Sequence, residues 1–206
     1  VPVGLLLERA SALAEQTMMK SLGDPLQRET ASTRRAVEIL NSYGVTAYQD
    51  ANTTLPMLKA LTALDRQGEL NAWCVGSLPV FNTLSGTELF GDALIARREE
   101  FRTTHVQPNF IKLFMDGVPM TRTAAMLDAY KPDEQGRVTV CRSFLRLPEV
   151  VEWIAKAETF GLGVKIHCAG DAAVHDILDA VEIVRKLRGP SRVMHHIAHA
   201  SFIDPN

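Results

Sequence analysis

Short apolar stretches alternate with amphipathic stretches along most of this chain, and this alternation restricts its fold more than any other feature. Apolar side chains at helical spacing occupy the segments 1–19, 31–43, 53–68, 88–102, 148–161 and 172–187. Strand-like runs lie at 44–51, 71–80, 110–117, 163–168 and 192–200. Parallel strands need a crossover connection, and a helix is the usual one. The order therefore predicts an α/β fold built from parallel βαβ units.

Residues with special backbone or capping properties mark several of the expected helix ends. Gly44 follows the helix at 31–43, and Gly23, Asp24 and Pro25 interrupt the pattern after the first helix. The helix at 53–68 has a threonine cap, a proline in its first turn and a glycine at its end. No glycine-rich loop follows the first strand, so neither a dinucleotide site nor a phosphate loop is supported.

Composition indicates one soluble domain over residues 1–206 whose partner is a small molecule. Hydrophobic residues make up 46% and charged residues 22% of the chain, and the net charge of -2 gives no reason to expect nucleic acid or a membrane surface. The chain has no apolar run of about 20 residues. Its three cysteines, Cys74, Cys141 and Cys168, cannot all pair and fit a reducing compartment. We therefore expect a cytoplasmic protein.

Polar residues lie on three of the expected strands, most of them at or near the point where the strand ends. The strand at 110–117 carries Lys112 and ends in Asp116-Gly117, the strand at 163–168 ends in His167, and the strand at 192–200 ends in His199. The carboxyl ends of parallel strands gather function in α/β folds, and neutral imidazoles are common ligands of zinc-like ions. Lysine is a ligand only when deprotonated or carbamylated. Spacing alone leaves open that both histidines are capping or core residues.

Four segments, in chain order, resemble the amidohydrolase superfamily, and most closely the family-3 amidohydrolases related to N-substituted formamide deformylases. They are "GVTAYQDA", "IKLFMDG" with "RTAAMLDAY", "IHCAGDAAVHDILDAVE" and "HHIAHASFIDP". The resemblance implies a metal-dependent (β/α)8 barrel that hydrolyses carbon-nitrogen bonds other than peptide bonds. The expected substrate is then a small amide-like molecule.

The same resemblance implies roles for individual residues. His167 and His199 would be metal ligands on successive strands, and Lys112 would occupy the place of a carbamylated lysine or another bridging ligand. Zinc or a similar divalent ion would activate a water for attack on a carbonyl. Lys165, two residues before His167, is a rival for a polar interior role, but the resemblance favours Lys112.

The chain also departs from the family pattern. It contains no HxH motif and no aspartate after an eighth strand, and Asp204 lies too close to the last strand to replace it. We expect a partial TIM barrel, about strands two to six of eight, from a longer protein. Such a piece alone would be hydrolytically poor, and its open sheet edges predict self-association into a homo-oligomer or aggregate. The alternative is an inactive barrel segment that acts as a binding or assembly module.

The sequence also makes predictions about five further features. Asp171 is expected to cap the following helix. His195 lies an even number of residues from His199, so a regular strand would turn both side chains the same way. His105 and His175 are expected to be solvated. The loop from 118 to 147 is long enough to be a lid or a substrate wall, and the alternative is a mobile surface loop.

Overall fold

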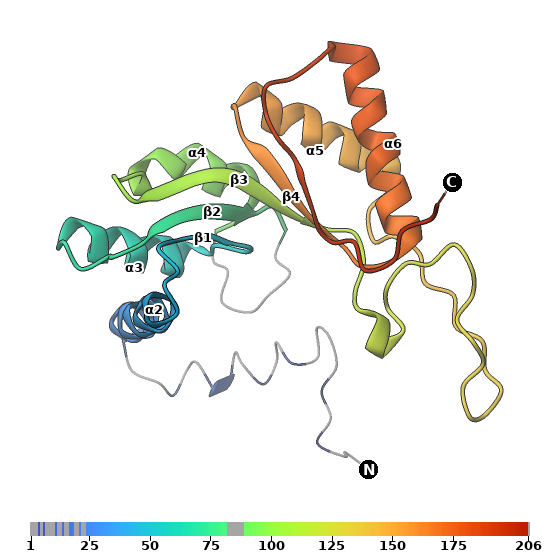
Figure 1. Ribbon diagram of the computed structural model, residues 1–206, viewed down its shortest axis with the longest axis horizontal. Helices are drawn as coiled ribbons and strands as arrows, with labels where there is room; N and C mark the ends of the chain where they lie inside the picture. Colours follow the sequence, from blue (N-terminus) through green and yellow to red (C-terminus); the bar gives the residue numbers. More distant parts are fainter. Residues whose placement is uncertain are drawn as a thin grey trace. The chain divides into compact units, whose positions relative to one another are not determined.

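The computed structural model describes residues 24–81 and 89–205, together with single positions before residue 24 (Figure 1). The helix expected at 1–19 lies outside the residues described as an element. The helices are α2 (Pro25–Ser42), α3 (Leu55–Arg66), α4 (Gly91–Arg97), η1 (Arg98–Phe101), η2 (Pro119–Thr121), α5 (Leu147–Thr159) and α6 (Asp171–Arg188). The strands are β1 (Ala47–Asp50), β2 (Trp73–Pro79), β3 (Val106–Phe114), β4 (Gly163–Cys168) and β5 (His196–His199).

Strands and helices alternate from β1 onward, as the sequence predicted. The strand order follows the chain, β1-β2-β3-β4-β5. Tyr48 pairs with Cys74 in the parallel register of β1 and β2, and Ile166 pairs with Ile197 in that of β4 and β5. The chain divides into two compact units, Val1–Ile111 and Lys112–Asn206, and β3 contributes residues to both. The expectation of one domain over 1–206 stays a prediction.

Helix α2 begins earlier than the expected residue 31. Asp24 is its N-cap and accepts a hydrogen bond from the Leu26 backbone N–H at 2.9 Å, while Pro25 occupies the first turn. A proline is tolerated there because that turn has no intrahelical partner for its N–H. The break expected at residues 23–25 is therefore the start of the helix. Its end agrees with the prediction, since Gly44 follows with a φ of 77°.

The first unit is built around one apolar cluster shared by its helices and strands. The cluster comprises Val37, Leu61, Leu64, Leu70, Ala72, Cys74 and Val106, with Tyr48 packed against it. Helices α2 and α3 pack against each other on this side. Strand β2 is buried along most of its length, as expected for a parallel strand covered on both faces.

The second unit places α5 and α6 together over β4. Val150, Ile154 and Ala157 are the buried residues of α5, and they share one helical face as the spacing predicted. Helix α6 buries Ala173, Val174, Ile177, Ala180 and Val184. Strand β4 is buried at every position except Lys165. No helix among the described residues is long and apolar enough to span a membrane.

Other boundaries also differ from the expectation, among them that of β3, which covers Val106–Phe114 rather than 110–117. The helix expected at 88–102 is the short α4 followed by the 3-10 turn η1. Strand β5 covers only residues 196–199 of the run expected at 192–200. Thr54 stands at the N-cap of α3, but its side chain makes no capping hydrogen bond. Apolar patterning thus located these elements, whereas hydrogen bonding decided where each one begins and ends.

Candidate metal centre

His167 lies near the end of β4 with its imidazole almost fully enclosed. Its Nε2 atom is 2.8 Å from the backbone carbonyl oxygen of Gly117. A carbonyl oxygen can only accept, so Nε2 carries a hydrogen, and in the neutral ring Nδ1 is the nitrogen with the free lone pair. Histidines that ligate metals through one ring nitrogen usually donate the other N–H to a carbonyl or carboxylate in this way.

The ring of His199 lies beside the ring of His167. The two centroids are 4.6 Å apart, with the planes inclined at 66°. In the strand register His199 is opposite Cys168, and Ala198 is opposite His167. A regular strand would therefore point His199 and His167 to opposite faces. His199 instead has a φ of 76°, and this left-handed backbone breaks the alternation where the two rings meet.

The chain after His199 remains attached to the end of β4 despite this break. The Ala200 N–H donates to the Cys168 carbonyl at 2.9 Å, and the Phe202 N–H donates to the Ala169 carbonyl at 3.1 Å. Ala200 also has a positive φ, of 45°. Two consecutive non-glycine residues in a sparsely populated conformation are unusual, and such strain concentrates at functional sites.

Lys112 is buried on β3, with only 4% of its surface exposed. Its Nζ atom lies 4.3 Å from the centre of the Phe114 ring. Burial, followed by the positive charge of Lys165, lowers the pKa of Lys112 to about 8. Lys165 is thus close enough to act on Lys112 electrostatically, but Lys112 is the enclosed member of the pair.

The electrostatic surroundings of His199 favour its neutral form. Desolvation, followed by the charges of His167 and Lys112, lowers the pKa of His199 below the ordinary value. A neutral imidazole is the form that can ligate a metal. Burial raises the pKa of the neighbouring Cys168 thiol well above the usual range, so this cysteine remains a thiol at neutral pH.

Asp116 is a residue of this region that the sequence reasoning did not assign. Its carboxylate is buried and accepts backbone N–H groups from Ala169, Gly170 and Ala125. Its Oδ1 atom lies 3.5 Å from Nε2 of His167. The Asp-Gly pair that follows β3 was visible in the sequence. Two hydrogen-bond partners of Asp116, Ala169 and Gly170, lie 53 and 54 residues away along the chain.

His195 lies outside the regular strand and packs in the interior of the second unit, which is the alternative to a common face with His199. Strand β5 begins only at residue 196, so the even spacing does not apply. The His195 Nδ1 atom accepts the Val164 backbone N–H at 3.2 Å, and Nε2 lies 2.9 Å from the Glu158 carboxylate of α5. His195 is therefore a buried structural residue that joins β4 to α5.

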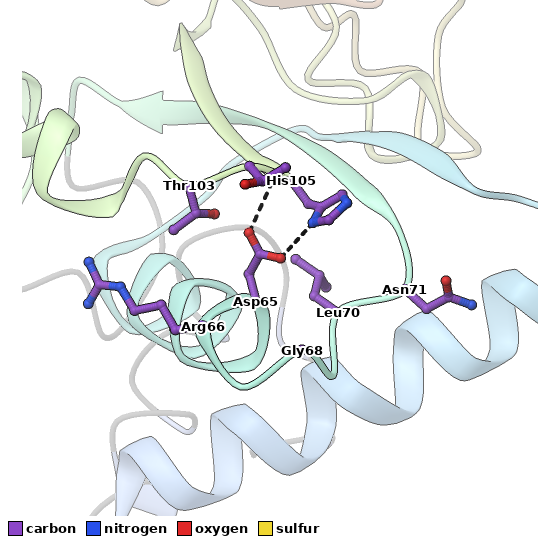
Figure 2. A pocket seen from close by; sticks show the side chains of 8 residues that line it. Asp65, Arg66, Gly68, Leu70, Asn71, Thr103 and His105 are labelled. Atoms are coloured by element: carbon purple, nitrogen blue, oxygen red, sulfur yellow. Dashed lines mark hydrogen bonds and ion pairs between the residues drawn. The ribbon is translucent and has the colours of Figure 1, made fainter.

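The sequence predicted a solvated His105, but in the structure its side chain pairs with Asp65. Its Nδ1 atom lies 2.6 Å from one carboxylate oxygen of Asp65, and its backbone N–H donates to the other at 3.0 Å (Figure 2). The pair borders an open pocket of about 630 Å³ that also includes Arg66, Asn71 and Thr103. The Trp73 ring contacts His105 edge-on. His175, by contrast, has an exposed side chain on α6, as predicted.

Asp171 is the first residue of α6 rather than its cap. Gly170 occupies the N-cap position. The Asp171 carboxylate instead accepts the Leu127 backbone N–H at 2.9 Å, in addition to that of Ala172. Asp171 thereby attaches the loop expected at 118–147 to the start of α6.

Part of that long loop is packed rather than free. Ala124 and Ala125 are fully buried. The Tyr130 hydroxyl donates to the Ala124 carbonyl, and Ser143 contacts Asp176 of α6. Ala124 and Ala125 are therefore not surface residues, whereas the roles of the loop as a lid, a substrate wall or a mobile surface loop stay predictions.

The geometry brings His167, His199 and Lys112 into one region of the second unit, although it does not complete a metal cage. Among the residues that the structure describes, no three His, Cys, Asp or Glu side chains are arranged to hold a metal ion. Two imidazoles and a buried lysine can supply part of a coordination sphere.

The chain belongs to the amidohydrolase family, whose model matches residues 2–206. Two solved structures, both of uncharacterized metal-dependent hydrolases, share its fold. The Pyrococcus furiosus protein has a TM-score of 0.67 and 26% identity, and covers 82% of this chain and 34% of its own. The Pyrococcus horikoshii OT3 protein has a TM-score of 0.62 and 25% identity, and covers 77% of this chain and 31% of its own. These likenesses confirm the expected partial barrel.

A curated relative is the exoenzymes regulatory protein AepA of Pectobacterium carotovorum subsp. carotovorum. It is 29% identical over 166 residues, which cover 80% of this chain and 34% of the relative. The chain thus spans about a third of the length of the proteins it matches.

Proposed function

We propose that this chain forms part of the metal centre of a hydrolase that cleaves carbon-nitrogen bonds other than peptide bonds in a small amide-like substrate. His167, His199 and Lys112 are the residues that would hold the ion, and zinc is the ion we expect. The observation that carries the proposal is the approach of the two imidazoles to 4.6 Å between centroids, achieved through a left-handed residue at the end of β5.

The donor set fits a divalent ion of the zinc type. The hydrogen bond to Gly117 places the hydrogen of a neutral His167 ring on Nε2, so Nδ1 is the nitrogen that would offer its lone pair to an ion. The lowered pKa of His199 keeps its ring neutral. Such an ion, when bound, supplies a Lewis acid that polarises a carbonyl and lowers the pKa of a water.

The residues of this chain have distinct parts in that chemistry. His167 is held by Gly117 and presents one nitrogen in a fixed direction. Lys112 is enclosed, and its pKa of about 8 leaves an appreciable neutral fraction at neutral pH. A neutral amine is the form that can react with carbon dioxide to give a carbamate, which would add a carboxylate to the two imidazoles.

The test is the metal content of the full-length protein and of two matched histidine variants. We expect one or two divalent ions per chain, measured by elemental analysis after dialysis. His167→Ala should lose metal and hydrolysis of amide-like substrates. His175→Ala is the control, because His175 lies on the same unit with a side chain that is 54% exposed, and it should retain both. Equal metal content in the two variants would contradict the proposal.

A second candidate function is a binding or assembly module without catalysis. Two observations favour it: the described residues contain no complete metal-holding group, and the relative AepA is named as a regulatory protein. This reading expects no bound metal in the full-length protein, and therefore no difference between His167→Ala and the unaltered chain in the same measurement.

A further inference from the structure

We propose that Asp116 is a positioning residue whose carboxylate fixes the main chain after His167 and so sets the direction of the His167 imidazole. The proposal rests on the metal-site role of His167 given above. Asp116 would act through backbone amides and would not touch the metal or the substrate.

The carboxylate is surrounded by backbone donors. Oδ1 accepts the Ala169 N–H at 2.9 Å, and Oδ2 accepts the Gly170 N–H at 2.8 Å and the Ala125 N–H at 2.9 Å. Only 1% of the Asp116 surface is exposed. Hydrogen bonds from N–H groups to a carboxylate are short and strong, so the turn from β4 into α6 has little freedom to move away from Asp116.

The residues on either side of Asp116 hold His167 itself. The Met115 N–H donates to the His167 carbonyl at 2.9 Å, and the Gly117 carbonyl accepts the His167 Nε2–H at 2.8 Å. Met115, Asp116 and Gly117 thus all bind the end of β4. Met115 binds the His167 carbonyl, Gly117 binds the His167 ring, and Asp116 binds the backbone amides that follow His167. A displacement of Asp116 would move the Gly117 carbonyl and release the ring.

Both oxygens of Asp116 are already engaged, and this distinguishes the residue from a metal ligand. Three of about four acceptor positions on the carboxylate are used by backbone N–H groups. Oδ1, which accepts only one of these N–H groups, lies 3.5 Å from Nε2 of His167, the ring nitrogen that carries the hydrogen and cannot ligate an ion. The burial of Asp116 and its donors favour positioning.

Close packing at Gly170 secures the third donor. A Cβ atom on Gly170 would lie 1.9 Å from the carbonyl oxygen of Ala125. Only glycine lets this loop residue approach so closely, and the same loop residue supplies an N–H to Asp116. Ala125 of the loop, Gly170 of the turn and the Asp116 carboxylate therefore pack closely together next to the end of β4.

The experiment compares Asp116→Asn with Asp171→Asn in the full-length, metal-free protein. Nitrogen NMR of ¹⁵N-histidine-labelled protein reports which ring nitrogen of His167 carries the hydrogen. We expect the unaltered protein and Asp171→Asn to show the Nε2–H form alone. Asp116→Asn should show a mixture of tautomers, because an amide NH2 would face backbone N–H donors and displace the turn. Affinity for added Zn²⁺ should fall about 10- to 100-fold in Asp116→Asn only.

An unchanged His167 tautomer in folded Asp116→Asn would overturn the proposal. Failure of the proposed metal-site function would give a different result. The unaltered protein would then bind no Zn²⁺, while the tautomer measurement would still report whether Asp116 positions the ring. If Asp116→Asn does not fold, Ala125→Pro replaces it, since it removes one N–H donor and keeps the carboxylate. A partial shift in the tautomer ratio supports the proposal there, and no shift overturns it.

Discussion

Replacement of Glu158 by alanine should be among the most destabilising single changes in the second unit. The Glu158 side chain is 8% exposed and contacts two groups with the same oxygen: Nη2 of Arg185 at 2.6 Å and Nε2 of His195 at 2.9 Å. Because Val164 donates to Nδ1 of His195, Nε2 must carry a hydrogen. Arg185 and His195 therefore point donors at each other across 3.3 Å, and Glu158 is the acceptor that reconciles them.

The expected cost follows from what Glu158→Ala leaves behind. Arg185 would retain its charge without the carboxylate, and its Nη1 atom is already buried without a hydrogen-bond partner among the described residues. Breaking a buried ion pair by removing one member costs about 3–5 kcal/mol. Arg185 keeps 27% of its side chain exposed, so the lower part of that range, about 3 kcal/mol, is the expected loss.

The assay is urea unfolding at pH 7, with Glu182→Ala as the matched control. Glu182 also pairs with a cation, Lys186, but both side chains are more than half exposed on α6. Such a helical pair contributes about 0.5 kcal/mol or less. A loss below about 1 kcal/mol for Glu158→Ala, comparable to the control, would refute this reasoning.

The same cluster gives a pH dependence whose sign follows from Glu158. Burial alone would raise the pKa of Glu158, but hydrogen bonds from Arg185 and His195 outweigh burial and hold its pKa below the ordinary 4.5. A carboxyl with a lowered pKa in the folded state stabilises the protein above its ordinary value, and this stabilisation disappears as the pH falls through the folded pKa. The difference between the unaltered protein and Glu158→Ala should therefore shrink below about pH 4.5.

Three further outcomes are expected. Burial would raise the pKa of Asp65, but hydrogen bonds from Thr103 and His105 lower it overall; Asp65→Asn should therefore cost about 1–2 kcal/mol at pH 7 and progressively less below about pH 4 in urea unfolding. Gly170→Ala should speed trypsin cleavage within residues 118–146, because its Cβ would displace Ala125; an unchanged cleavage rate would contradict this. His199→Gly should be about 1 kcal/mol more stable than His199→Ala by thermal unfolding, since only glycine adopts a φ of 76° without strain; equal stabilities would show that the backbone there is relaxed.

Element types and the strand-end position of His167 could be predicted because they depend on local patterns. Strand β4 is an apolar run followed by an amphipathic helix, and this pattern places its last residues at the edge of the sheet. The start of α2 was also readable in principle from Asp24 and Pro25. Gly23, Asp24 and Pro25 together are typical of a break, but an aspartate before a proline also favours a helix start.

The arrangement around the site could not be predicted, because it depends on contacts between residues remote in the chain. The spacing of His195 and His199 suggested a common face, but Glu158 of α5 holds His195 before the strand begins. No feature of the sequence predicts the left-handed φ of His199. That conformation accompanies the hydrogen bonds of Ala200 and Phe202 to the end of β4, which depend on residues remote in the chain. The partners of Asp116 are backbone amides, which every residue carries and no motif records.

The left-handed conformation of His199 has a cost, and its persistence needs a physical explanation. A non-glycine residue in this region costs on the order of 1–3 kcal/mol. The hydrogen bonds of Ala200 and Phe202 to the end of β4 offset part of it, yet both could form with glycine at position 199, which would remove the strain. What glycine cannot supply is an imidazole beside His167. Under the proposed function the two rings would ligate one ion together, which would account for the strained residue, and Asp116 would fix the direction of the His167 ring for the same purpose.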